Sequence, residues 1–248
     1  LILIVDDNPD VQFYLTVCLS ENFQLIYAEN GKIGFEMARD YIPDMVISDI
    51  MMPEKTGIEM CKELKNDLRT DHIPVILLTA KAQDEWRMKG LSCGADSYLT
   101  KPFIKEELLI IIEQLIFKKN KLVQKFNNDY PSLINKNRSN KNQHKFIDKT
   151  IHLILKNLDH SDYGPPDLAK DLCLSESQVY RKLKAMTDKP TSLFIRSVRL
   201  EEARNMLETS DKTISEISFD TGFNDPSWFS RAFKKAYGHS PSDHVKTN

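Results

Sequence analysis

Short apolar runs alternate with longer amphipathic segments through the first half of the chain. The apolar runs cover residues 1–5, 23–28, 45–47, 75–78 and 97–99, and helical patterns cover residues 11–19, 33–38, 58–68 and 85–91. A regular alternation of strands and helices is typical of a parallel sheet with helices on both of its faces. We therefore predict a five-stranded, doubly wound α/β domain. A further helix near Lys105 is apolar on more than one face, so one side can pack on the sheet while the rest meets a partner.

The pattern changes twice more along the chain. From Lys118 to about Lys145 it gives way to Lys, Asn and Gln with few large apolar residues, which predicts a linker. Helical periodicity returns at Phe146 and continues to the end, without a segment typical of a strand. The predicted organisation is an α/β domain over residues 1–117, a linker over residues 118–145 and an all-α domain over residues 146–248.

The all-α half contains two similar helical units. In the first, Pro166 opens a short helix, and Ser175 with Gln178 forms the capping box of another helix after a tight turn. In the second, Asp225 can cap a helix that follows the turn at Gly222. Two helices joined by a tight turn form a helix-turn-helix, so we predict two such units.

The two units present the same polar residues at a fixed offset. The second helix of each unit has its apolar residues on one face and polar residues on the other. The polar faces carry Ser177, Arg181 and Lys184 in the first unit and Ser227, Arg231 and Lys234 in the second, and the members of each pair are 50 positions apart. Residues 192–207 form one helix between the units, roughly 24 Å long. A solvated surface would explain a single such face, whereas the repeated set favours a binding surface.

Charge is divided unevenly between the halves. Residues 1–116 hold 11 Lys and Arg against 20 Asp and Glu, and residues 117–248 hold 23 against 16. A basic helical half beside an acidic one predicts different partners, with nucleic acid as the partner of the basic half. The four cysteines show no C-x-x-C spacing, so we predict neither a disulfide framework nor a zinc site.

Charged and polar residues stand where the predicted strands end. They are Asp6 and Asp7 after the first strand, Asp49 after the third, Thr79 after the fourth and Lys101 after the fifth. Because the carboxyl ends of parallel strands meet at one edge of a sheet, three carboxylates can converge there. Oxygen ligands of this kind suit Mg²⁺. A single Asp at a strand end is usually a cap or turn residue, but this combination predicts a site for phosphoryl chemistry.

With these residues, positions 1–117 resemble the response-regulator receiver domain. The similarity rests on the acidic pair, on the intervals of 30 and 22 residues that separate Asp49, Thr79 and Lys101, and on the Pro-Phe that follows Lys101. It implies a flavodoxin-like fold and, by analogy, a homodimer on phosphorylation. The roles it implies are Asp49 as phosphoacceptor, Asp6, Asp7, Asp49 and the Met51 carbonyl as magnesium ligands, Thr79 and Lys101 as phosphoryl contacts, and Tyr98 as an aromatic switch.

Positions 146–245 resemble the AraC/XylS-type DNA-binding domain, in which a long helix joins two helix-turn-helix motifs. The similarity is carried by the run from Gly222 to Arg231, GFNDPSWFSR, and by Ser240-Pro241. Asp188 stands where a glycine is common in that family. The resemblance implies double-stranded DNA as a partner. The predicted DNA-binding residues are Ser177, Tyr180, Arg181, Lys184, Asn224, Ser227, Arg231, Lys234 and Lys235.

We interpret the chain as a non-enzymatic, phosphorylation-controlled transcription regulator of a two-component phosphorelay. It begins inside a strand and without Met, which we expect of a segment of a hybrid protein that also carries the histidine kinase. We expect a cytoplasmic location without membrane contact by this segment, any anchor belonging to an upstream sensor. Two alternatives remain open: a free-standing response regulator with a separate kinase, and a magnesium-dependent phosphatase. Turnover of a phosphoester would favour the phosphatase, and a single stoichiometric acyl phosphate would favour the regulator.

Overall fold

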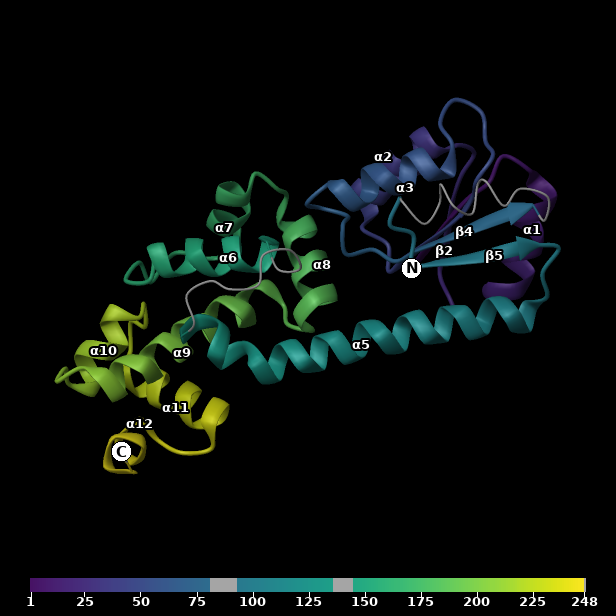
Figure 1. The fold of residues 1–248 in the computed structure, drawn as a ribbon. Coiled ribbons are helices and arrows are strands. Elements are labelled where there is room, and N and C mark those ends of the chain that lie inside the picture. The colour runs from purple at the N-terminus through teal and green to yellow at the C-terminus, as the bar shows by residue number, and fades with distance from the viewer. Residues whose placement is uncertain (81–92, 136–144, 248) are drawn as a thin grey trace. The chain divides into compact units, whose positions relative to one another are not determined.

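A five-stranded parallel sheet forms the centre of the first part of the chain. The computed structural model describes residues 1–80, 93–135 and 145–247, and the chain divides into two units, Leu1–Leu122 and Val123–Asn248 (Figure 1). The strands are β1 (Ile2–Val5), β2 (Leu25–Ala28), β3 (Met45–Asp49), β4 (Val75–Ala80) and β5 (Ser97–Lys101). They lie in the order β2-β1-β3-β4-β5, and every neighbouring pair is parallel. The predicted five-stranded doubly wound sheet is therefore confirmed.

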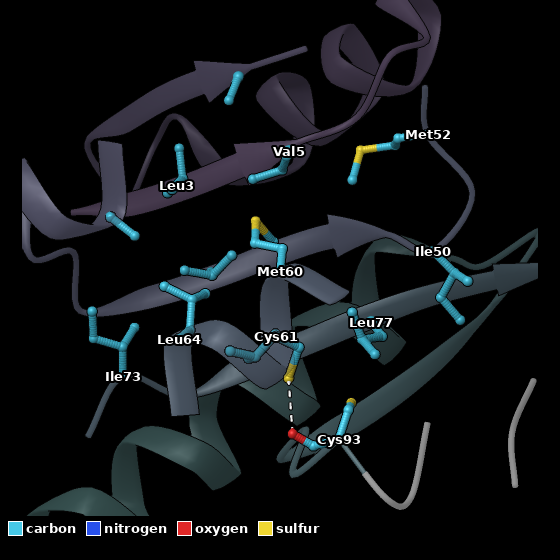
Figure 2. Packing of buried hydrophobic residues seen from close by; sticks show 14 of the residues in the cluster. Leu3, Val5, Ile50, Met52, Met60, Cys61, Leu64, Ile73, Leu77 and Cys93 are labelled. Atoms are coloured by element: carbon cyan, nitrogen blue, oxygen red, sulfur yellow. Dashed lines mark hydrogen bonds between the residues drawn. The ribbon is translucent and has the colours of Figure 1, made fainter. Parts of the chain in front are cut away.

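Two apolar cores lie on opposite faces of this sheet, because successive residues of a strand point to opposite sides. Leu3 and Val5 of β1 belong to one core, shown in Figure 2, and Ile2 and Ile4 belong to the other. The first core is closed by α2 (Gly31–Tyr41) and α3 (Gly57–Asn66), and the second by α1 (Pro9–Leu19) and α5 (Lys105–Asn135). The helix predicted over residues 85–91 lies outside the described residues.

Helix α5 is longer than the sequence pattern predicts. Leu108, Ile112 and Leu115 of its first turns pack in the core of the sheet. The helix continues to Asn135, into the segment predicted as a linker from Lys118 onward. The segment is mostly polar, but its apolar residues Leu122, Phe126 and Tyr130 recur every four positions, which is a helical spacing that the prediction overlooked. The rest of the predicted linker, residues 136–144, lies outside the described residues.

The second unit is helical throughout its described part. Its helices are α6 (Lys145–Lys156), α7 (Pro165–Leu172), α8 (Glu176–Thr187), α9 (Thr191–Thr209), α10 (Ile214–Asp220), α11 (Pro226–Tyr237) and α12 (Pro241–Thr247). The predicted capping box is present at the start of α8, where the Gln178 amide donates to the Ser175 hydroxyl and the Gln178 side chain accepts from the Ser175 amide. The Asp225 carboxylate accepts from the Ser227 amide at 2.8 Å, which starts α11 as predicted. The helix-turn-helix pairs are thus α7–α8 and α10–α11.

Helix α9 joins the two pairs as one continuous helix, as the sequence predicts. Its Leu200, Ala203 and Leu207 pack against Phe229 and Phe233 of α11. The rings of these two phenylalanines lie 5.8 Å apart at an interplanar angle of 57°. Tilted contacts of this kind contribute packing energy beyond the buried area. The second pair is therefore held against α9 by an aromatic core.

Candidate functional site

Three side chains meet at the carboxyl edge of the sheet. Asp6 follows β1, Asp49 ends β3 and Lys101 ends β5. The ammonium group of Lys101 donates to Asp6 Oδ2 at 2.9 Å and to Asp49 Oδ1 at 2.5 Å. Because β4 lies between β3 and β5, the lysine reaches over the end of one strand to bring the two carboxylates together. The sequence predicted this meeting of residues that are 95 and 52 positions apart.

Burial and hydrogen bonds at this edge of the sheet shift the pKa values of Asp6 and Lys101. Asp6 is only 1% exposed, and burial raises the pKa of its carboxyl, although the Asn8 amide and the Lys101 ammonium oppose that rise. Burial alone would lower the pKa of Lys101, but its hydrogen bonds to Asp49 and Asp6 outweigh this effect and raise it. The lysine therefore stays charged and partly neutralises the two acids.

The backbone also fixes Asp49. Its Oδ2 accepts a hydrogen bond of 2.8 Å from the Met51 amide. The loop after it closes where the Gly57 amide donates to the Ile50 carbonyl at 3.0 Å. A Cβ at Gly57 would lie 2.0 Å from the Asp49 carbonyl oxygen, so no side chain fits at that position. The start of α3 is thus packed directly against the backbone of Asp49.

The predicted convergence of three carboxylates differs from what the structure contains. Asp7 is exposed, and the described residues contain no group of three acidic, His or Cys side chains close enough to hold a metal. Asp6 is almost fully buried at the end of β1, whereas Asp7 lies in the bend that follows and is exposed. The buried carboxylate of Asp6 and the partly buried carboxylate of Asp49 still fit magnesium, which commonly takes one or two carboxylates and keeps several waters. The roles assigned to Asp7 and the Met51 carbonyl stay predictions.

The two remaining receiver positions lie near this edge. Thr79 is partly buried in β4, between the strands that carry Asp49 and Lys101, and pairs in register with Thr100. Tyr98 is partly buried against the core of α2 and α3, with its hydroxyl 4.0 Å from Cys93 Sγ. Burial raises the pKa of Tyr98, so its ring carries a neutral hydroxyl at physiological pH. The switch role of Tyr98 stays a prediction.

The outward face predicted for the first helix-turn-helix is confirmed. Val179 and Leu183 of α8 are fully buried. The predicted DNA-binding side chains of α8 are all exposed, namely Ser177, Tyr180, Arg181 and Lys184. Three of them, Ser177, Tyr180 and Arg181, line a hollow together with Pro165 and the start of α9. Whether this face contacts DNA stays a prediction.

The second helix-turn-helix repeats this arrangement. Phe229 and Phe233 of α11 are fully buried. The predicted DNA-binding side chains are exposed, namely Asn224, Ser227, Arg231, Lys234 and Lys235. The offset of 50 positions therefore relates two helices whose inward positions are apolar and whose outward positions carry the same Ser, Arg and Lys.

The two faces differ at their carboxyl ends. Asp188 ends α8 and Gly238 ends α11, and both have left-handed backbone, with φ of +59° and +85°. Asp188 occupies the conformation that favours glycine. Its carboxylate pairs with Lys184 at 2.7 Å, and its carbonyl accepts from the same lysine at 2.9 Å. Asp188 therefore ends α8 in the left-handed conformation that a glycine commonly adopts. It also forms an ion pair with Lys184, one of the cations of the outward face.

Two buried cations were missed by the sequence analysis. Lys182 is fully buried, with its ammonium 4.6 Å from the centre of the Phe146 ring. It follows Val179 by three residues, so helical periodicity places it on the inward face and could have identified it. Arg199 is buried in the middle of α9, where nothing but its helical position signalled a role.

The comparisons with known proteins match both units. Residues 2–113 match the family model of the response regulator receiver domain, and residues 168–247 match that of a helix-turn-helix domain of the AraC type. The chain belongs to the response regulators, as a receiver domain followed by an AraC-type helix-turn-helix domain. This is the make-up of a phosphorylation-regulated transcription regulator.

Individual relatives extend this result. The chain is 41% identical over 116 residues to Protein PilH of Pseudomonas aeruginosa, covering 46% of this chain and 96% of that protein. It is 32% identical over 243 residues to Histidine kinase P4 of Formosa agariphila, covering 98% of this chain but only 18% of that protein. Among solved structures, it is similar to the receiver domain of a Pseudomonas aeruginosa sensor histidine kinase with a magnesium ion coordinated in the active site cleft. That similarity has a TM-score of 0.44 and 28% identity, over 46% of this chain and 95% of the other.

The described helices were also compared with the requirements of a membrane span. None of them combines the length and the apolar character that crossing a bilayer requires.

Proposed function

We propose that this chain is the phosphorylation-controlled output segment of a two-component phosphorelay. The single observation that carries the proposal is the Lys101 ammonium bonded to both Asp6 and Asp49 at the edge of the sheet. A positioned carboxylate with a cation beside it can act as a nucleophile toward phosphorus, because the cation stabilises negative charge that develops on the phosphoryl oxygens.

In the proposed reaction, a carboxylate oxygen of Asp49 attacks the phosphorus of a phosphohistidine on the kinase. The phosphorus–nitrogen bond breaks, the imidazole keeps its electron pair, and an acyl phosphate forms on Asp49. The Met51 amide and Lys101 hold the carboxylate in one orientation before attack. Magnesium bound by Asp6, Asp7, Asp49 and the Met51 carbonyl would neutralise charge on the phosphoryl oxygens. Thr79 would then donate a hydrogen bond to the phosphoryl group.

The kinase is proposed to lie on the same, longer polypeptide. Nearly all of this chain aligns with a small part of a protein named as a histidine kinase, which supports a hybrid arrangement. A separate kinase is the alternative. Phosphate transfer within the full-length parent at a rate that does not change on dilution would support the hybrid, whereas a rate proportional to concentration would support a separate kinase.

We propose that the second unit of the chain binds specific double-stranded DNA through the outward faces of α8 and α11. A helix of this kind fits the major groove, and two such helices held by α9 would meet segments about one helical turn, roughly 34 Å, apart on the same side of the duplex. Exposed arginines at the centre of each face, Arg181 and Arg231, support the proposal because a guanidinium can pair with guanine through two hydrogen bonds.

The phosphoacceptor assignment is tested with acetyl phosphate as donor. The protein is incubated with donor and magnesium, and intact mass spectrometry measures phosphate uptake. We expect one phosphate per wild-type chain and none on Asp49→Asn. Asp44→Asn is the matched control, because Asp44 precedes β3 at the opposite edge of the sheet and pairs with Lys119 at 3.0 Å.

Two outcomes would reject the assignment. One is undiminished phosphate uptake by Asp49→Asn, and the other is uptake that a magnesium chelator does not change. Continuous release of inorganic phosphate from a phosphoester substrate, without a stable acyl phosphate, would instead support the phosphatase alternative.

A further inference from the structure

A single buried arginine donates hydrogen bonds to backbone carbonyls beside both helix-turn-helices. Arg199 lies in α9 and is 8% exposed. One terminal nitrogen donates to the carbonyl of Gly222 at 3.2 Å, in the turn between α10 and α11. The other donates to the carbonyls of His160 at 2.6 Å and Tyr163 at 3.3 Å, in the segment between α6 and α7. The guanidinium therefore bonds simultaneously to the turn of the second helix-turn-helix and to the segment that leads into the first helix-turn-helix.

The two segments also touch each other at this point. Gly222 has a φ of +75°, and a Cβ there would lie 2.5 Å from the Leu158 carbonyl oxygen and 2.8 Å from the guanidinium carbon of Arg199. Any side chain would push the segments apart. The glycine is therefore required both by its left-handed backbone and by the close approach of Arg199.

The segment between α6 and α7 is in turn bonded to α7 of the first helix-turn-helix. The Tyr163 hydroxyl donates to the Asp171 carboxylate of α7 at 2.9 Å. Contacts thus run from α7 through Tyr163 and Arg199 to the turn that precedes α11. Burial lowers the pKa of Arg199, but arginine stays protonated in proteins, so its hydrogen bonds to carbonyls compensate the buried charge.

We propose that Arg199 is a positioning residue that sets the separation and angle of the reading helices α8 and α11, and thereby the spacing of the DNA segments that the protein selects. The inference rests on the proposed binding of DNA by both helix-turn-helices. The carbonyls that Arg199 bonds belong to none of the outward residues of α8 and α11. Loss of Arg199 should therefore leave the reading residues intact while relaxing the geometry that relates them.

The test measures spacing selectivity. Wild-type full chain selects duplexes from a random pool, and footprinting locates the two protected segments. Binding is then compared between the selected duplex and versions with about 2 base pairs inserted or deleted between the segments, which rotates one segment by roughly 70°. We expect the wild type to lose affinity about tenfold or more on altered spacing, as for a lost base contact, and Arg199→Met to bind all three duplexes within about threefold.

Matched variants separate this role from general stability. Arg204→Met removes an arginine of the same helix whose contacts are Glu201, Glu208 and the Tyr237 ring. These contacts do not include the segment between α6 and α7, so this variant should keep the wild-type selectivity. If circular dichroism shows Arg199→Met unfolded, Arg199→Lys is compared instead. Lysine keeps the charge but cannot donate to both segments in the same fork geometry, so a folded Arg199→Lys should also lose selectivity.

The outcomes distinguish this inference from the proposed function. A wild-type footprint confined to one groove segment would overturn both the tandem reading and the inference built on it. A wild type that prefers one spacing, together with a folded Arg199 variant that prefers the same spacing to the same degree, would overturn the role of Arg199 alone.

Discussion

Asp6 and Lys101 are joined by a hydrogen bond of 2.9 Å although β3 and β4 lie between the strands that carry them. Only a long side chain can bridge that distance along the edge of the sheet, and the carboxylate it reaches is almost fully buried. Burial raises the pKa of Asp6 by more than the Asn8 amide and the Lys101 ammonium lower it. Asp6 therefore costs the folded receiver stability when it is ionised.

Asp6→Asn is expected to stabilise the receiver at neutral pH in the absence of magnesium. A carboxyl whose pKa is raised on folding is most favourable below its unfolded pKa of 3.8, and that advantage is lost as the pH rises through the folded value. The amide removes the ionised form, so we expect a gain of roughly 0.5–2 kcal/mol, as is common for such substitutions. Thermal unfolding at pH 7 measures it, and the gain should shrink as the pH is lowered.

Magnesium provides the control for Asp6. A bound ion at 100 times its Kd would stabilise the wild type by about 2.7 kcal/mol. Asp6→Asn should show little of this magnesium-dependent increase in Tm. Equal increases in both proteins would mean that Asp6 is not a ligand.

Gly57→Ala is expected to destabilise the receiver by about 1–3 kcal/mol, the range for overpacking. The new methyl group would meet the Asp49 carbonyl oxygen, and backbone cannot move away as a flexible side chain can. Gly164→Ala is the control, since its nearest new contacts would be at 3.6 and 3.7 Å. Urea unfolding of each variant compares them. A Gly57→Ala protein as stable as the wild type would show that the start of α3 can move away from Asp49.

Phosphorylation is expected to tighten self-association of the receiver. Thr79 lies between the strands of Asp49 and Lys101, and a hydrogen bond to the new phosphoryl group would draw it toward Asp49 and give Tyr98 room to turn. The partner surface would include exposed apolar residues of α5, such as Ile110 and Phe117. Sedimentation of phosphorylated and unphosphorylated protein at equal concentration measures the change. Thr79→Ala should remove it, and identical association constants for the wild-type forms would contradict the switch.

Arg231→Ala and Lys235→Ala are expected to weaken DNA binding in different ways. Loss of an arginine that pairs with guanine should cost about 1–3 kcal/mol on the selected site and relax preference at one base pair. Loss of a phosphate contact should weaken all sequences alike and reduce the salt slope by about one. Both side chains are exposed on the same helix, so each is the control for the other. Uniform loss for Arg231→Ala would identify it as a phosphate contact.

Sequence patterns predicted the features that depend on periodicity and on strand ends. The alternation of Leu3 and Ile4 between two cores follows from the two-residue period of a strand, and the meeting of Asp49 with Lys101 follows from parallel topology. The capping box at Ser175 was visible because its two partners are three residues apart.

Other features depend on contacts that no local pattern reports. The exposure of Asp7 beside a buried Asp6 depends on which neighbour of an acidic pair the sheet edge buries. The role of Arg199 required knowing that segments 62 residues apart, around His160 and Gly222, come together.

The ion pair between Lys184 and Asp188 makes the outward faces of α8 and α11 unequal in charge. Lys234 stands at the equivalent place beside Gly238, and the described part of the chain gives it no ion pair. Long-range attraction to a polyanion depends on uncompensated charge, and it raises the rate of encounter. We therefore expect α11 to make the first contact with the duplex and α8 to bind afterwards. In that case α11 sets the rate of encounter, and α8 completes the bound complex.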